Sequence, residues 1–283
     1  MSLLEGCVPP CHSCEYGDGS SPLGTLRQAV AHDHVECVLA LVSDRGYDVH
    51  ADKSPASAYH SALMATAIAN GSPKMVHTLL QLGVETSEDE WEDCLMTDNS
   101  LVFGVLLSHR ATNGGVKCAD GLMAKALSYA SDGCVKVLLD FGVPADGIFE
   151  GQSYLEMAVG SGSLAVCRCL LASMPSSYIS SGCLLHRVVV EKPWTSADDL
   201  KTITALYLNR DASMSVDAED ADGSSLLTLA LDGMKPKYAA FLLQLGAPIR
   251  EADVSLLLDC GHQQFIAVGG LLSRRCEWNC PLV

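Results

Sequence analysis

A repeated pattern of two short apolar segments followed by a stop residue runs through most of the 283-residue chain. The unit Met123–Gly142 shows the pattern. Ala126 is the small residue inside its first segment, and Leu138 and Leu139 lie near the end of its second segment. A glycine then follows, as is typical just after a helix, because glycine adopts the left-handed conformation that ends a helix. The pattern predicts a series of helix–turn–helix units.

The predicted ends of these units recur at a nearly constant interval. We predict that the second helices stop at Gly46, Gly83, Arg110, Gly142, Met174, Asp211 and Gly246. Consecutive stops lie 37, 27, 32, 32, 37 and 35 residues apart, with a mean close to 33. A single unit of this kind cannot bury its apolar face, so neighbouring units are expected to stack and share one core.

Several units carry fragments of a known repeat signature. His34–Glu36 and Gly261–Gln264 match the start of a second helix, and Leu185-His186 matches part of a first-helix opening. With the period near 33, these fragments make the chain resemble the ankyrin-repeat family. The resemblance implies an all-α fold, an α-solenoid of about seven to eight stacked helix-turn-helix repeats with short hairpin connections. It also implies that His186 stabilises a turn by a hydrogen bond.

The repeats divide the chain unevenly. We expect an N-terminal Cys-containing arm at 1–20, a repeat solenoid at 21–275 and a C-terminal tail at 276–283. An insertion near 192–198 lies between the two helices of the sixth repeat and contains Pro193 and Trp194. Because proline cannot continue a helix, this stretch is expected to loop out of the stack. The third repeat lacks a terminal glycine and is predicted to stop at Arg110.

Charge and hydrophobicity exclude several classes of protein. The chain has 18 Lys+Arg against 34 Asp+Glu, a net charge of −16, and 48% of its residues are hydrophobic. This composition argues against intrinsic disorder, and the negative charge argues against nucleic-acid binding. No apolar stretch reaches the ~18–20 residues that span a bilayer, and the N-terminal residues do not resemble a secretory signal. We expect an intracellular protein, cytoplasmic or nuclear, without membrane association.

Thirteen cysteines are spread along the chain, an odd number that favours reduced, buried thiols over a disulfide framework. Three of them and a histidine form a cluster near the N-terminus: Cys7, Cys11, His12 and Cys14. These residue types bind zinc, but four tetrahedral ligands so close together would strain the loop. We therefore predict no metal and no cofactor, and these four residues are the candidates for a metal site.

Motifs for catalysis are missing from the sequence. It contains neither a phosphate-binding G-x-x-x-x-G-K-[ST] loop nor a G-x-S-x-G nucleophile elbow. His34 and Glu36 occupy positions that the repeat uses structurally, whereas His32 is expected to project toward the groove. One alternative therefore stays open, an enzyme that uses a concave-groove pocket and acid–base residues on a small-molecule substrate. Its candidate catalytic residues are His32, His60, Asp33 and Asp52.

In ankyrin stacks, partners are bound by the hairpin tips and the exposed ends of the first helices, so the resemblance implies a protein–protein interaction module or scaffold. The first-helix ends and the inserted loop contribute His32, Asn70, Met96, Ser128, Tyr129, Glu191, Trp194, Asp232 and Asp259. The hairpin tips contribute Asp52, His60, Phe149, Gln152, Asp220 and Asp222. Two inter-repeat segments, 85–93 and 217–222, are strongly acidic and favour a basic protein or peptide partner.

Overall fold

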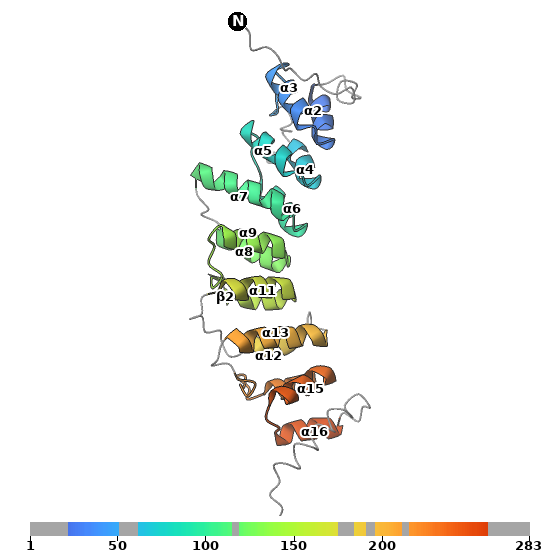
Figure 1. The fold of residues 1–283 in the computed structure, drawn as a ribbon, viewed down its shortest axis with the longest axis vertical. Coiled ribbons are helices and arrows are strands. Elements are labelled where there is room, and N and C mark those ends of the chain that lie inside the picture. Colours follow the sequence, from blue (N-terminus) through green and yellow to red (C-terminus); the bar gives the residue numbers. More distant parts are fainter. Residues whose placement is uncertain are drawn as a thin grey trace, which may run out of the picture. The chain divides into compact units, whose positions relative to one another are not determined.

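A computed structural model describes residues 22–50, 62–114, 119–174, 184–190, 196–210 and 215–259. The chain divides into two units, Met1–Val143 and Pro144–Val283. Both are built from antiparallel helix pairs joined by tight turns (Figure 1). The all-α repeat architecture that the sequence predicts is confirmed, with seven helix pairs and one further first helix in the described part of the chain.

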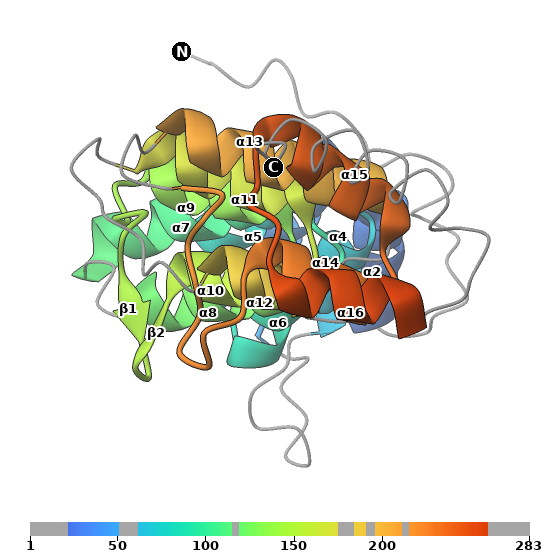
Figure 2. The same cartoon turned by 90° about the horizontal axis from the view of Figure 1, so that it is seen from below.

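The described helices of the first unit are α2 (Pro22–Ala31), α3 (Val35–Ser43), α4 (Ala62–Ala69), α5 (Pro73–Gln81), α6 (Glu88–Met96), α7 (Ser100–Gly114), α8 (Ala119–Ser128) and α9 (Asp132–Asp140). The first helices α2, α4, α6 and α8 pack against one another in order, and the second helices α3, α5, α7 and α9 do the same. The unit therefore consists of two helical layers, one of first and one of second helices (Figure 2).

The second unit begins with a short antiparallel hairpin, β1 (Ile148–Phe149) and β2 (Gln152–Ser153), in which Ile148 pairs with Ser153. Its described helices are α10 (Tyr154–Ser161), α11 (Leu164–Ser173), α12 (Leu184–Val190), α13 (Ala197–Arg210), α14 (Leu226–Asp232), α15 (Pro236–Leu245) and α16 (Glu251–Asp259). Here α10, α12, α14 and α16 form the layer of first helices, and α11, α13 and α15 form the second layer.

The core lies between the two layers of each unit, as the repeat pattern predicts. Five first helices contain a small residue that is fully buried. These residues are Ala29, Ala67, Ala126, Ala158 and Ala230. Small side chains let neighbouring helices approach closely, because the interaxial distance depends on the residues at the contact. The aliphatic pairs near the ends of the second helices are buried too, except that Leu139 is half-buried beside the fully buried Leu138.

Most predicted helix stops are correct. Glycines with φ between 65° and 104° follow the second helices at Gly46, Gly83, Gly142 and Gly246. Met174 caps α11, and α13 ends directly before position 211. The predicted stop at Arg110 is wrong, because α7 continues to Gly114. The Arg110 guanidinium lies 5.3 Å from the centre of the Trp91 ring and packs there from within the helix.

Helix α12 ends at Val190 and α13 begins at Ala197, so Ala197 and Asp198, which the sequence assigns to the insertion of the sixth repeat, belong to α13. The insertion itself stays a prediction. Residues 191–195, with Pro193 and Trp194, lie outside the described residues.

Candidate functional site

A polar cluster joins the exposed faces of α6 and α8 in the first unit. The Nζ atom of Lys125 lies 2.9 Å from Oε2 of Glu92, and the Tyr129 hydroxyl donates a hydrogen bond to Oε1 of the same carboxylate. Glu92 belongs to α6, whereas Lys125 lies in α8 and Tyr129 directly follows it. One carboxylate therefore fixes two side chains of the next repeat on the surface.

These contacts shift the pKa values of all three groups. The hydrogen bond from Tyr129, followed by the hydrogen bond and charge of Lys125, lowers the pKa of Glu92. The same contacts raise the pKa of Tyr129, mainly through its hydrogen bond to Glu92, and raise the pKa of Lys125, again mainly through Glu92. The cluster thus holds an ionised carboxylate, an ammonium and a neutral phenol at neutral pH.

Exposed apolar side chains are found on the α6–α7 pair of helices and at the end of α8. Met96, the last residue of α6, is 62% exposed, and Leu101, near the start of α7, is 71% exposed. The Tyr129 side chain is 39% exposed. Met96 lies one helical turn beyond Glu92, so the two side chains share one face of α6. Glu88, Glu92, Asp93, Met96, Lys125 and Tyr129 are called the α6–α8 patch below.

Helix α6 is firmly anchored beneath the patch. Trp91 is buried, meets the Phe103 ring edge-on at 5.8 Å between ring centres, and donates from Nε1 to Oγ1 of Thr86 at 3.2 Å. At the start of the helix, the buried Glu90 carboxylate accepts the backbone N–H of Ser87 at 2.6 Å. The patch therefore stands on a rigid support, which lowers the entropic cost of binding.

The α6–α7 and α8–α9 pairs also exchange helix caps. Both carboxylate oxygens of Asp98 accept backbone N–H groups at the start of α9, from Gly133 at 3.2 Å and Cys134 at 2.9 Å. In return, the Ser131 hydroxyl donates to the Leu95 carbonyl near the end of α6. These bonds satisfy terminal backbone groups that a helix leaves unpaired and fix the register of adjacent repeats.

Asn70, which the sequence predicts to contact a partner, instead links two neighbouring repeats through hydrogen bonds. Its amide Nδ2 donates to the carbonyl oxygens of Val30 at 3.2 Å and Ala31 at 3.1 Å, at the end of α2. Its side chain therefore joins the first two repeats. The predicted contact residue Ser128 is exposed, and its hydroxyl donates to the carbonyl of Ala124 in its own helix at 2.9 Å.

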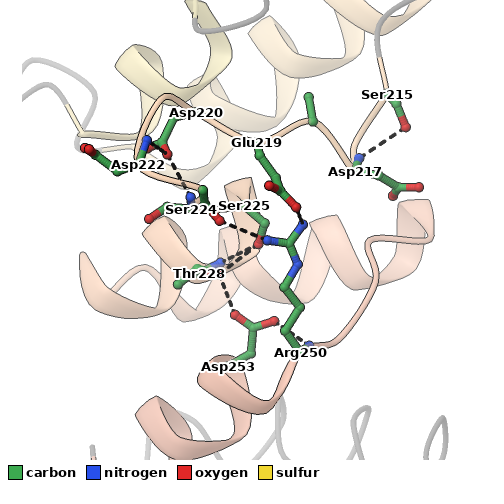
Figure 3. Close-up of polar contacts among 12 residues, drawn as sticks. Ser215, Asp217, Glu219, Asp220, Asp222, Ser224, Ser225, Thr228, Arg250 and Asp253 are labelled. Carbon is green, nitrogen blue, oxygen red and sulfur yellow. Dashed lines mark hydrogen bonds and ion pairs between the residues drawn. The ribbon is translucent and has the colours of Figure 1, made fainter.

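The acidic hairpin of the second unit is held by its own side chains (Figure 3). Oδ1 of Asp220 accepts the backbone N–H groups of Ser224 at 2.7 Å and Asp222 at 3.0 Å. Arg250 lies 2.6 Å from the carboxylate of Glu219 and also donates to the Gly223 carbonyl at 3.1 Å. The carboxylate of Asp220 thus shapes the hairpin, while Asp222 is exposed at its tip.

The base of this hairpin is joined to the last described helix. Asp253 is fully buried at the start of α16, where it accepts the backbone N–H of Arg250 at 2.8 Å and the Thr228 hydroxyl at 2.7 Å. These contacts link α14 to α16 and position Arg250 for its bonds to the hairpin (Figure 3). Sequence reasoning did not identify Asp253, although an acidic residue in the first turn of a helix is typical of such a cap.

The histidines have different environments. His32 and Asp33 are exposed in the turn between α2 and α3, and the His32 ring stacks on His34 at 5.8 Å between ring centres. His60 and Asp52 lie outside the described residues, so the acid–base pair stays a prediction. His186 is buried, and its Nε2 atom lies 3.0 Å from the carbonyl oxygen of Ala218, which fits the turn-stabilising role that the resemblance implies.

The remaining predicted contact residues are scattered. Gln152 and Asp232 are exposed, and Phe149 is half-buried in the β1–β2 hairpin. Asp259 is the last residue of α16, and its side chain is not among those described, while Glu191 and Trp194 lie outside the described residues. Sequence reasoning missed the cluster of Glu92 with Lys125 and the predicted Tyr129, because the contacts of Glu92 reach into the next repeat.

The cysteines in the described part of the chain all lie within helices. Cys37, Cys94, Cys134 and Cys167 are buried and Cys169 is half-buried. Burial raises the pKa of Cys94 and of Cys167 to about 12, so these thiols stay protonated at neutral pH. Among the described residues, no three or more His, Cys, Asp or Glu side chains are grouped to hold a metal ion. The metal candidates Cys7, Cys11, His12 and Cys14 lie outside them.

A helix that spans a bilayer needs about 20 predominantly apolar residues. None of the helices in the described part of the chain is both long and apolar enough to span a membrane.

Comparisons with known proteins find similarity in structure. No protein-family model and no curated protein matches the chain. The crystal structure of the human ASB11 ankyrin repeat domain is similar over 80% of this chain and 99% of that one, with 16% sequence identity and a TM-score of 0.52. The ankyrin repeat domain of Bcl-3, a unique member of the IkappaB protein family, covers the same shares at 18% identity, with a TM-score of 0.48.

Proposed function

Because the chain has the ankyrin-repeat fold, as its sequence predicts, we propose that it is a protein–protein interaction module. The observation that carries this proposal is the α6–α8 patch, where the exposed side chains of Met96 and Tyr129 lie on a rigid layer of first helices. Neither of these side chains contributes to the buried core. A partner that covers them would remove apolar surface from water, which is the main driving force of association.

The patch has the composition of a recognition surface. Binding sites combine an apolar centre with a polar rim, and tyrosine and methionine are enriched in them. Here Tyr129 and Met96 supply the apolar part, while Glu92 and Lys125 surround it with charge. A fold alone does not define a function, so the proposal depends on these side chains and not on the repeat architecture.

We propose further that the partner is a basic protein segment. Helix α6 carries five acidic residues between Glu88 and Met96 and no basic one. The whole chain has a net charge of −16. A negative surface attracts a basic partner over a distance of about 8–10 Å at moderate salt and raises its association rate.

Selection from a displayed library of random peptides tests this function on the full chain. We expect recovered peptides to be rich in Lys and Arg, and their dissociation constants to rise as the salt concentration increases. Display particles that carry no peptide serve as the control for background binding. Recovery of no peptide above that background, or of acidic peptides whose binding ignores salt, would contradict the proposed function.

A further inference from the structure

Each of the two acidic segments of the chain contains carboxylates that stabilise the fold. In the hairpin of the second unit, Arg250 pairs with Glu219, and Asp220 accepts two backbone N–H groups. These contacts set the shape of the hairpin, so two of its carboxylates already have structural partners (Figure 3).

The acidic segment of the first unit likewise contains structural carboxylates and exposed ones. Glu90 is buried in its cap and Glu92 is held by Lys125 and Tyr129. Glu88 and Asp93 are exposed, and among the described residues no Lys, Arg or His side chain forms an ion pair with either of them. Lys125 offsets part of the negative charge of α6, because its ammonium group interacts electrostatically with Glu88 as well as with Glu92.

Helical spacing places these acids beside the exposed apolar side chain. Glu88, Glu92 and Met96 follow one another at intervals of four residues, and Asp93 precedes Met96 by three, so all four lie along one side of α6. At 1.5 Å per residue, Glu88 and Met96 are about 12 Å apart along the helix axis. Tyr129 lies next to this row because its hydroxyl binds Glu92.

We propose that the α6–α8 patch binds an extended basic segment of a partner protein, in which a Lys or Arg lies about three to four residues from an apolar side chain. An extended chain rises about 3.3 Å per residue, so this spacing matches the distance from Glu88 to Met96. The apolar side chain packs against Met96 and Tyr129, and the cation meets Glu88, while Asp93 adds negative charge between them. This inference rests on the proposed function and assigns it to one surface.

Matched charge variants of the full chain test the assignment, with the peptides recovered from the displayed library as probes. The variant Glu88→Gln/Asp93→Asn removes two exposed acids of the patch. The control Asp217→Asn/Asp222→Asn removes the same charge from exposed positions of the second unit. We expect the patch variant to weaken binding about fivefold, a modest loss because each exposed ion pair contributes little. The control should change binding less than twofold, because its residues lie outside the patch.

Met96→Ala tests the apolar half of the patch and should weaken binding about tenfold, since it removes a side chain from the centre of the interface. Each of these residues is exposed, so circular dichroism should show an unchanged helical signal. If the control variant weakens binding as much as the patch variants, or the patch variants bind like the natural chain, the assignment is overturned while the proposed function stands. If no peptide binds the natural chain, both fail.

Discussion

The exchange of caps at Asp98 leads to a quantitative prediction about the cohesion of neighbouring repeats. Asp98 has φ of 50°, a left-handed conformation, and its carboxylate accepts the N–H groups of Gly133 and Cys134 in the next helix pair. The carboxylate approaches this closely because position 133 has no side chain, and a Cβ there would lie 3.1 Å from both Asp98 oxygens. The residue therefore combines a helix cap with a strained backbone.

Three substitutions separate these contributions. Asp98→Ala removes the cap and keeps a Cβ in the left-handed region, as aspartate does, so we expect a loss of about 1–2 kcal/mol. Asp98→Gly also removes the cap but relieves about 1 kcal/mol of backbone strain, so its net loss should be at most about 1 kcal/mol. Asp98→Asn keeps one acceptor and tolerates the backbone, so it should lose only about 0.5–1 kcal/mol of charge–dipole energy.

Amide hydrogen exchange measures this effect where it arises. A loss of about 2 kcal/mol would speed exchange about thirtyfold at the amides of Gly133 and Cys134 if local opening controls the rate. Urea unfolding, followed by circular dichroism, gives the global change in stability. The alanine variant should be the least stable of the three. Equal exchange in all three variants, or an alanine variant as stable as the glycine variant, would refute the reasoning.

Three further outcomes follow from the structure. Tyr129→Phe should raise the pKa of Glu92 toward the ordinary glutamate value in a carbon-13 NMR titration. In the natural chain, the contacts of this carboxylate should be lost only as the pH falls through its lowered pKa, and an unchanged pKa would count against the hydrogen bond. Gly147→Ala should cost about 1–3 kcal/mol in thermal unfolding, because a Cβ would lie 2.4 Å from the Tyr154 ring; an unchanged melting temperature would contradict this contact. Cys94 should resist alkylation at neutral pH until the chain unfolds, since its thiol is buried and has a pKa of about 12, and rapid labelling of the folded chain would disprove that burial.

The fold could be predicted from sequence features that lie within single repeats. The small residue in most first helices and the glycine after several second helices are properties of single repeats, so they can be recognised without knowing which repeats touch. Gly142 and Ala126 are examples, with φ of 90° and full burial respectively. The stop predicted at Arg110 was wrong because α7 continues through residues that all tolerate a helix, and the side chain at this position packs on Trp91.

The site was harder to predict, because its geometry depends on contacts between repeats. The sequence identified Met96 and Tyr129 from their positions in the repeat, but the carboxylate of Glu92 that binds Tyr129 lies 37 positions earlier in the chain. The acidic run also hid a structural residue. Glu90 lies three positions after Ser87, the spacing of a capping box, and this signal distinguishes it from its exposed neighbour Glu88.

The central claim is that the α6–α8 patch of the first unit contacts the partner. NMR of the full chain with carbon-13-labelled methionine methyl groups tests it most directly, because Met96 and Met234 are both exposed, at 62% and 45%, and lie in different units. On addition of a basic peptide recovered from the displayed library, the Met96 methyl signal should shift and the Met234 signal should stay in place. A shift of Met234 with no change at Met96 would contradict the claim.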